Sequence, residues 1–153
     1  MPLPPLTEAT VRLGASVEDW RAAVRVAGGV LVSAGAVSRG YPQRMVEVIE
    51  EFGAYVVIAP GLALAHARPG DDVNADGLSL VTLETPVSFG HAHNDPVSVV
   101  IGIAVTTADA HVTGIAELAN AFNDPELVPA LSAATDVGQA IELIRAGATR
   151  GAA

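Results

Sequence analysis

His66 directly follows an apolar stretch, residues 55–65, and is itself followed within four residues by Arg68, Pro69 and Gly70. Apolar sequence on one side and a turn on the other predict an imidazole at the edge of a core, beside a fixed positive charge. A neutral imidazole in that position can act as a nucleophile. A nearby guanidinium disfavours protonation of the ring and is well suited to receive an anion such as phosphate. These residues therefore predict a nucleophilic histidine that accepts an anionic group.

His111 is a second candidate, because it follows Asp109 and Ala110 at the start of a predicted helix. The first turn of a helix presents unpaired N–H groups and the positive end of the helix dipole, both of which favour anions. A histidine there can contact a phosphate carried by another side chain. In the alternative interpretation Asp109 only caps the helix and His111 is a surface residue.

The pair His91 and His93 has the spacing of two metal ligands, and His66 or Asp95 would be needed to complete a zinc site. The surrounding segment is polar and rich in turn residues, which suits a solvated loop equally well. A histidine-based metal-binding module is therefore kept as an alternative, while the favoured interpretation needs no metal and no bound cofactor.

Eight Lys and Arg residues against seventeen Asp and Glu residues give a formal net charge of −9. Such a surface repels nucleic acid and anionic lipid and suits a basic protein partner, although it also serves simple solubility. The absence of cysteine excludes disulfides, a thiolate nucleophile and a Cys-ligated zinc site. Residues 1–7 do not resemble a signal peptide, and the apolar runs are far shorter than the roughly 20 residues that span a bilayer. We therefore expect a cytoplasmic protein.

Hydrophobic periodicity predicts helices at both ends of the chain and extended segments in the middle. The helices are expected at about 16–35, 41–53, 109–122, from Asn123-Asp124-Pro125 onward, and 136–145. The extended segments are expected at 55–59, 62–66, 78–83 and 97–105. The last of these is the best candidate for a central strand, because it is almost continuously apolar.

The order of these elements predicts a single α/β domain over residues 1–153, in which helices cover both faces of a mixed sheet. A length of 153 residues suits one sizeable core. The Pro-rich start, residues 1–7, and the last residues, 147–153, are expected to be flexible.

Several of these segments together resemble the enzyme IIA components of the bacterial phosphotransferase system, of the fructose/mannitol type and nearest to its ascorbate-like branch. The resemblance covers nearly the whole chain. It is carried by the segments Tyr55–Pro69, Gly77–Leu80, Pro86–His91, Asn94–Val97, Ala110-His111 and Asp124–Leu127.

The resemblance implies a mixed, roughly five-stranded sheet sandwiched between helices, and a phosphotransferase that works through a phosphohistidine. His66 would take a phosphoryl group from the carrier HPr and pass it to a cysteine of an enzyme IIB component, and so indirectly to the membrane permease IIC. His111 matches the family's second active-site histidine, and Arg68 would stabilise the anion. The chain departs from the family at Ala65, where a proline is usual, and at Arg44, which stands about a turn before the helix arginine of the mannitol-like branch.

A regulatory protein that signals through its phosphorylation state, without an enzyme IIB acceptor, is the alternative within the family. The sequence leaves open which sugar is transported, with ascorbate or a pentitol as candidates. It also leaves open the oligomeric state, a homodimer included.

Overall fold

The computed structural model describes the backbone of residues 4–152, and of these the side chains of His111, Gly114 and residues 148–152 lie outside the described part. Five strands and five α-helices follow a short 3-10 turn at Glu8–Thr10. The strands are β1 (Val11–Ala15), β2 (Val57–Ala59), β3 (Leu62–His66), β4 (Gly77–Val87) and β5 (Val97–Ala104). The helices are α1 (Trp20–Ser33), α2 (Tyr41–Phe52), α3 (Ala108–Ala121), α4 (Leu127–Ala133) and α5 (Val137–Ala152).

The strands form one mixed sheet in the order β1-β4-β5-β3-β2. β5 is antiparallel to β4 and parallel to β3, while the two edge strands pair parallel (β1 with β4) and antiparallel (β2 with β3). β5 is the central strand, as its apolar sequence predicts, because a strand with neighbours on both sides and helices on both faces has little contact with water.

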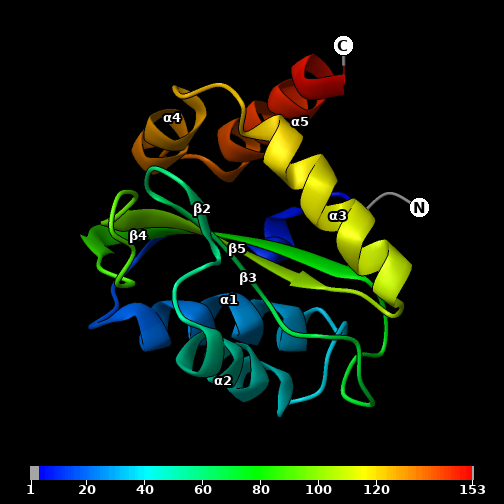
Figure 1. The fold of residues 1–153 in the computed structure, drawn as a ribbon. Helices are drawn as coiled ribbons and strands as arrows, with labels where there is room; N and C mark the ends of the chain where they lie inside the picture. Colours follow the sequence, from blue (N-terminus) through cyan, green and yellow to red (C-terminus); the bar gives the residue numbers. More distant parts are fainter. Residues whose placement is uncertain (1–3, 153) are drawn as a thin grey trace.

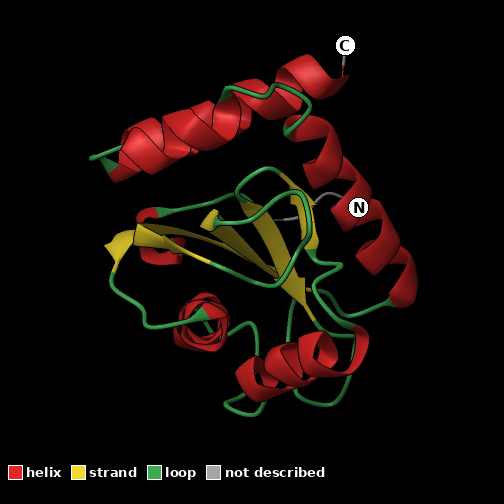
Figure 2. Cartoon of the chain, turned by 60° about the vertical axis from the view of Figure 1, so that its left-hand side comes forward, coloured by secondary structure: helices red, strands yellow, loops and turns green. Residues whose placement is uncertain are grey.

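Helices cover both faces of the sheet, which confirms the predicted α/β sandwich. α1 and α2 lie against one face, and α3, α4 and α5 lie against the other (Figure 1). The same two layers are visible after rotation, with the strands between them (Figure 2).

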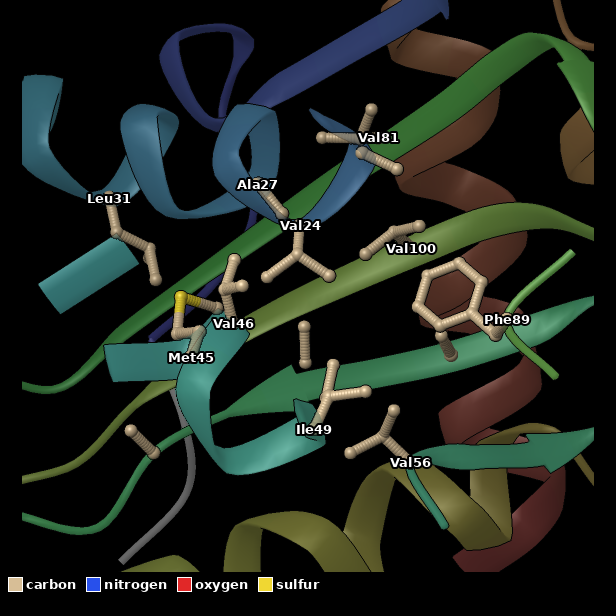
Figure 3. Packing of buried hydrophobic residues seen from close by; sticks show 14 of the residues in the cluster. Val24, Ala27, Leu31, Met45, Val46, Ile49, Val56, Val81, Phe89 and Val100 are labelled. Atoms are coloured by element: carbon tan, nitrogen blue, oxygen red, sulfur yellow. The ribbon is translucent and has the colours of Figure 1, made fainter. Parts of the chain in front are cut away.

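The first face of the sheet packs on α1 and α2 through aliphatic side chains and few aromatic ones. Figure 3 shows α1 and α2 contributing to the same cluster as Val81 and Val100 of the sheet. Gly28 of α1 allows α2 to come this close, because a Cβ there would lie 2.8 Å from the Cβ of Pro42. This close packing brings the first turn of α2 to the end of the sheet where β3 and β5 finish.

The second face packs on α3, α4 and α5 through a separate cluster. Its largest fully buried members on the sheet are Leu62, Leu64, Leu80, Ile101 and Ile103. Because β3 contributes to both clusters, all five of its residues are buried. The two cores therefore fix β3, and with it the position of His66, from both sides.

Two helices begin later than the sequence pattern predicts. α1 starts at Trp20 and not at Ser16, because the carboxylate of Asp19 accepts the N–H of Ala22 at 2.9 Å and acts as the N-cap. α4 starts at Leu127, with Pro125 in the turn before it and not in the helix.

β1 is absent from the sequence-based prediction, and two other elements are longer than predicted. β1 is an edge strand with only one neighbour, so its sequence lacks the continuous apolar character of a buried strand. β4 continues to Val87 through three exposed residues.

α5 continues to Ala152, whereas the sequence pattern predicts that this helix ends near Arg145. A Cβ at Gly147 would lie 2.9 Å from the carbonyl oxygen of Ala121, so this glycine allows α5 to cross α3 closely.

Candidate phosphoryl-accepting site

His66 is the last residue of β3 and lies opposite Ile103 of the parallel strand β5. It is one of three buried polar residues among those described, with 8% of its surface exposed. Its position at the carboxyl end of a buried strand agrees with the sequence prediction. The carboxyl ends of parallel strands are where ligands and reacting groups gather in open α/β sheets.

The proton on the His66 ring can be assigned from one contact. Nδ1 lies 2.8 Å from the carbonyl oxygen of Leu64. A carbonyl oxygen can only accept a hydrogen bond, so Nδ1 must carry the hydrogen and donate it. In the neutral ring this leaves Nε2 without a proton, which is the form that could act as a nucleophile. The main chain of β3 therefore selects the tautomer in which Nε2 carries no proton.

Tyr55 lies edge-on to the ring of His66, with ring centroids 6.0 Å apart and an interplanar angle of 85°. Partial burial raises the pKa of Tyr55, and the positive charge of Arg68 opposes this rise. Arg68 itself is exposed. Its guanidinium is therefore close enough to act on Tyr55, the residue that packs against the ring of His66.

The segment that follows His66 is held by Arg44 of α2. Its guanidinium donates to both carboxylate oxygens of Asp72, at 2.8 and 2.7 Å, and to the carbonyl oxygen of Arg68 at 2.7 Å. The hydrogen bond from Arg44 is the main reason that the pKa of Asp72 is lowered, and the pKa of Arg44 is raised for the same reason. Arg44 thus acts on the main chain next to His66 and not on the ring.

Replacing Arg44 by Gln should destabilise the protein by about 1 kcal/mol, since a bidentate but partly solvated ion pair is lost. Amide exchange should quicken at Ser38 and Val73, whose N–H groups donate to the carbonyl oxygens of Asp72 and Gly70. Chemical denaturation and hydrogen exchange measure the two effects.

Arg21→Gln is the matched control for that substitution, because it breaks the exposed pair between Arg21 and Glu50. Its expected cost is close to zero. An equal loss of stability in the two variants would show that Arg44 does not hold the segment after His66.

The backbone of His111 lies in the first turn of α3, at the same end of the sheet as His66. β5 ends at Ala104, and Thr107 caps α3 by accepting the N–H of Ala110 at 3.1 Å. Asp76 accepts the backbone N–H and the hydroxyl of Thr106, which joins this turn to the segment before β4. The side chain of His111 lies outside the described residues, so its predicted role stays a prediction.

His91, His93 and Asp95 lie at the opposite end of the sheet. Gly61, just before β3, donates its N–H to the carbonyl oxygen of Asn94, so this loop sits at the amino end of the strand that His66 finishes. At about 3.3 Å per residue, the five residues of β3 separate the two ends by roughly 16 Å. His66 therefore cannot complete a metal site with this pair.

The polar side chains of that loop accept hydrogen bonds from the backbone of the same loop. The Nδ1 of His91 accepts the N–H groups of His93 and Asn94, at 3.2 and 3.1 Å. The carboxylate of Asp95 accepts the N–H groups of Phe89, Gly90 and His91. No group of three or more metal-ligating side chains gathers anywhere in the part of the chain whose side chains are described. The described side chains therefore give no support to the alternative of a histidine-based metal module.

Two residues with contacts beside His66 were not predicted from the sequence. By comparison with the mannitol-like branch, Arg44 stands too early in its helix, and the sequence pattern predicts for Tyr41 only a position at a helix start. Tyr41 is buried, and its hydroxyl contacts the main chain at Ala67 and Ile103. One feature of the sequence indicates such a contact for Tyr41. An aromatic hydroxyl in the first turn of a buried helix needs a hydrogen-bond partner.

The comparison with protein families gives one match over most of the chain. The family model described as "Phosphoenolpyruvate-dependent sugar phosphotransferase system, EIIA 2" matches residues 5–147. Among curated proteins, the ascorbate-specific PTS system EIIA component of Escherichia coli (strain K12) is 40% identical over 136 residues, which cover 88% of each chain.

Solved structures show the same fold. The crystal structure of the mannitol IIA from Escherichia coli has a TM-score of 0.81 and 28% identity, and the match covers 91% of this chain and 98% of that one. An enzyme IIA for mannitol in complex with phosphorylated enzyme IIB, also from Escherichia coli, has a TM-score of 0.80 and 27% identity, with 92% and 97% covered. Among the described residues, no helix combines the length and apolar character needed to cross a membrane.

Proposed function

Because this chain belongs to the EIIA type-2 family of the phosphoenolpyruvate-dependent sugar phosphotransferase system, we propose that it carries a phosphoryl group on Nε2 of His66. The chain is thus an EIIA component of sugar transport and a phosphotransferase. The observation that carries the assignment of the atom is the 2.8 Å contact between Nδ1 and the carbonyl oxygen of Leu64. It leaves Nε2 as the nitrogen that carries no proton.

In the proposed transfer, bonds form and break only between the phosphoryl group and the two reacting side chains. The lone pair of Nε2 attacks phosphorus in line with the donor's N–P bond, that bond breaks, and its electron pair returns to the donor's nitrogen. The Nδ1 proton stays in its hydrogen bond to Leu64. In the second step a thiolate attacks the same phosphorus, a P–S bond forms, the Nε2–P bond breaks, and its electron pair returns to Nε2. Such transfers depend mainly on positioning and on stabilisation of charge.

Charge stabilisation is assigned to groups at the same end of the sheet. Arg68 provides a positive charge that is felt at Tyr55, beside the ring. The first turn of α3 provides N–H groups and the positive end of its dipole. We assign His111, whose backbone lies in that turn, to the stabilisation of the phosphoryl group. The proposed site contains no metal and no cofactor.

The proposed donor is the phosphohistidine of HPr, and the proposed acceptor is a cysteine of an enzyme IIB component, which passes the group on toward the permease IIC. A solved relative forms a complex with phosphorylated enzyme IIB. Two large apolar side chains near the site are exposed: Tyr55, which packs on the ring of His66, at 49%, and Val112, which follows His111 in sequence, at 68%. An apolar rim of this kind suits transient docking of a protein partner. The proposal places the chain in the cytoplasm, where this relay works.

For the sugar, we propose ascorbate, because the curated relatives are ascorbate-specific components. The chain itself does not contact the sugar in this scheme. Sugar specificity is therefore a property of the permease that it serves.

The test is a stepwise transfer assay. Phosphoenolpyruvate labelled at phosphorus, enzyme I and HPr should load one acid-labile phosphate on the chain, and addition of the ascorbate-type enzyme IIB should remove it. No label from phospho-HPr would contradict the proposal. A label that loads but passes to no enzyme IIB would point to the regulatory alternative.

A further inference from the structure

Tyr41 is a fully buried titratable residue that the transfer chemistry does not use. Its hydroxyl accepts the backbone N–H of Ala67 at 3.0 Å and lies 2.7 Å from the carbonyl oxygen of Ile103. The carbonyl oxygen of Ala67 is farther away, at 3.3 Å. A hydroxyl has one proton, so the shorter distance assigns its donation to Ile103.

The two main-chain groups belong to strands that have just stopped pairing. His66 and Ile103 are the last register pair between β3 and β5. At the end of this pairing, the Ala67 N–H donates to the hydroxyl of Tyr41, and the hydroxyl donates to the Ile103 carbonyl. A direct bond between them would have continued the strand pairing. The hydroxyl therefore separates the two strands immediately after His66.

We propose that Tyr41 is a positioning residue for the phosphoryl transfer: its hydroxyl separates β3 from β5 after His66 and fixes the peptide bond between His66 and Ala67. This inference rests on the proposed function of His66. Tyr41 acts through the main chain and touches neither the phosphoryl group nor the imidazole.

The peptide bond between His66 and Ala67 anchors one side of the Cα that carries the ring of His66. The ring donates to the carbonyl oxygen of a residue only two positions earlier, so a single combination of backbone and side-chain torsions closes the contact. If the main chain after His66 shifts, the Nδ1 bond to Leu64 is weakened and the proton is no longer confined to one nitrogen. The reactive Nε2 would then be misplaced and partly protonated.

The hydroxyl of Tyr41 is suited to a permanent role of this kind. Burial raises its pKa to about 12, with the backbone hydrogen bond to Ala67 opposing part of the rise. It therefore stays protonated throughout the physiological range and can donate and accept at the same time. α2 holds the ring in place, since Tyr41 is its first residue and packs in the cluster shared with α1.

The decisive variant is Tyr41→Phe, which keeps the ring and removes only the hydroxyl. Per folded molecule, its phosphorylation by phospho-HPr should be about 10- to 100-fold slower, as expected for a small misplacement of a reacting group. The KM for phospho-HPr should change less than about twofold, because no exposed residue is altered. The ¹⁵N signals of the His66 ring should shift from one fixed tautomer toward an average of the two.

Thr82→Val is the matched control, because it also removes a buried hydroxyl that accepts a backbone N–H. Thr82 accepts the N–H of Gly14 at 2.9 Å and pairs with Val99, four residues along β5 from Ile103. This variant should lose stability but transfer at the wild-type rate per folded molecule. The proposal is overturned if Tyr41→Phe transfers as fast as Thr82→Val and keeps the wild-type ring signals.

Two further results keep the inference separate from the function it rests on. If the wild type takes no label, the proposed function fails, and the ring signals of Tyr41→Phe still decide whether Tyr41 orients His66. If Tyr41→Phe does not fold, amide exchange of Ala67 in the wild type replaces it. Exchange as slow as global unfolding supports the hydrogen bond to Tyr41, and exchange within minutes overturns it.

Discussion

Replacing His66 by Gln should abolish phosphorylation by phospho-HPr, with a loss of at least about a thousandfold, because the nucleophilic nitrogen is removed and an amide cannot replace it. The fold should survive, since a Gln side chain can still donate a hydrogen bond to the carbonyl oxygen of Leu64. Labelling with phosphoenolpyruvate, enzyme I and HPr measures the effect, and circular dichroism checks the fold.

His93→Gln is the matched control for this loss. His93 is exposed and lies in the loop at the opposite end of the sheet, with its ring 6.3 Å from that of His91. It should load phosphate as the wild type does. Full labelling of His66→Gln, or loss of labelling in His93→Gln, would show that another histidine accepts the group.

The largest effect on stability is expected from Asp95→Ala. The carboxylate accepts the hydroxyl of Ser88 and three backbone N–H groups, among them that of the buried residue Phe89. Without the carboxylate these donors lose their partner, at an expected cost of about 2–3 kcal/mol in the free energy of unfolding. Chemical denaturation measures the difference.

Asp19→Ala serves as the reference for that cost, because Asp19 caps α1 through a single N–H. It should cost about 1 kcal/mol. Asp95→Ala should leave the transfer rate per folded molecule unchanged, since the loop lies at the far end of β3 from His66. A cost no greater than that of Asp19→Ala would contradict the assignment of Asp95 as the organiser of its loop.

The same carboxylate predicts a dependence of stability on pH. Burial raises the pKa of Asp95, but the hydrogen bonds from Phe89, Ser88, Gly90 and His91 outweigh burial and lower the pKa below its ordinary value of 3.8. A pKa that is lower in the folded than in the unfolded state gives stability that is complete above the unfolded value and is lost as the pH falls through the folded one. The advantage of the wild type over Asp95→Asn should therefore be constant near neutral pH and shrink below about pH 4.

The position of His66 could be predicted from the sequence because it depends on local pattern. The last part of the apolar run before it belongs to the buried strand β3, and Pro69 and Gly70 follow just beyond the strand. The central strand β5 was predicted on the same grounds. Both elements bury most of their residues, so their sequences are apolar at almost every position.

The contacts that orient the site could not be predicted, because they depend on how α2 packs. Arg44 and Tyr41 are about one helical turn apart, and both reach the segment that follows His66. Spacing along a helix does not reveal which loop lies opposite, so the sequence gives no sign that Arg44 pairs with Asp72. β1 was missed for a related reason, since an edge strand needs no continuous apolar run.

The central claim is that Nε2 of His66 carries the phosphoryl group while Nδ1 keeps its proton on the carbonyl oxygen of Leu64. The most direct test is a ¹⁵N–³¹P NMR measurement on the phosphorylated protein with ¹⁵N-labelled histidine. The account predicts one phosphorus coupled to Nε2 of His66 and a protonated Nδ1 on the same ring. Phosphorus coupled to Nδ1 of His66, or to a nitrogen of any other histidine, would contradict it.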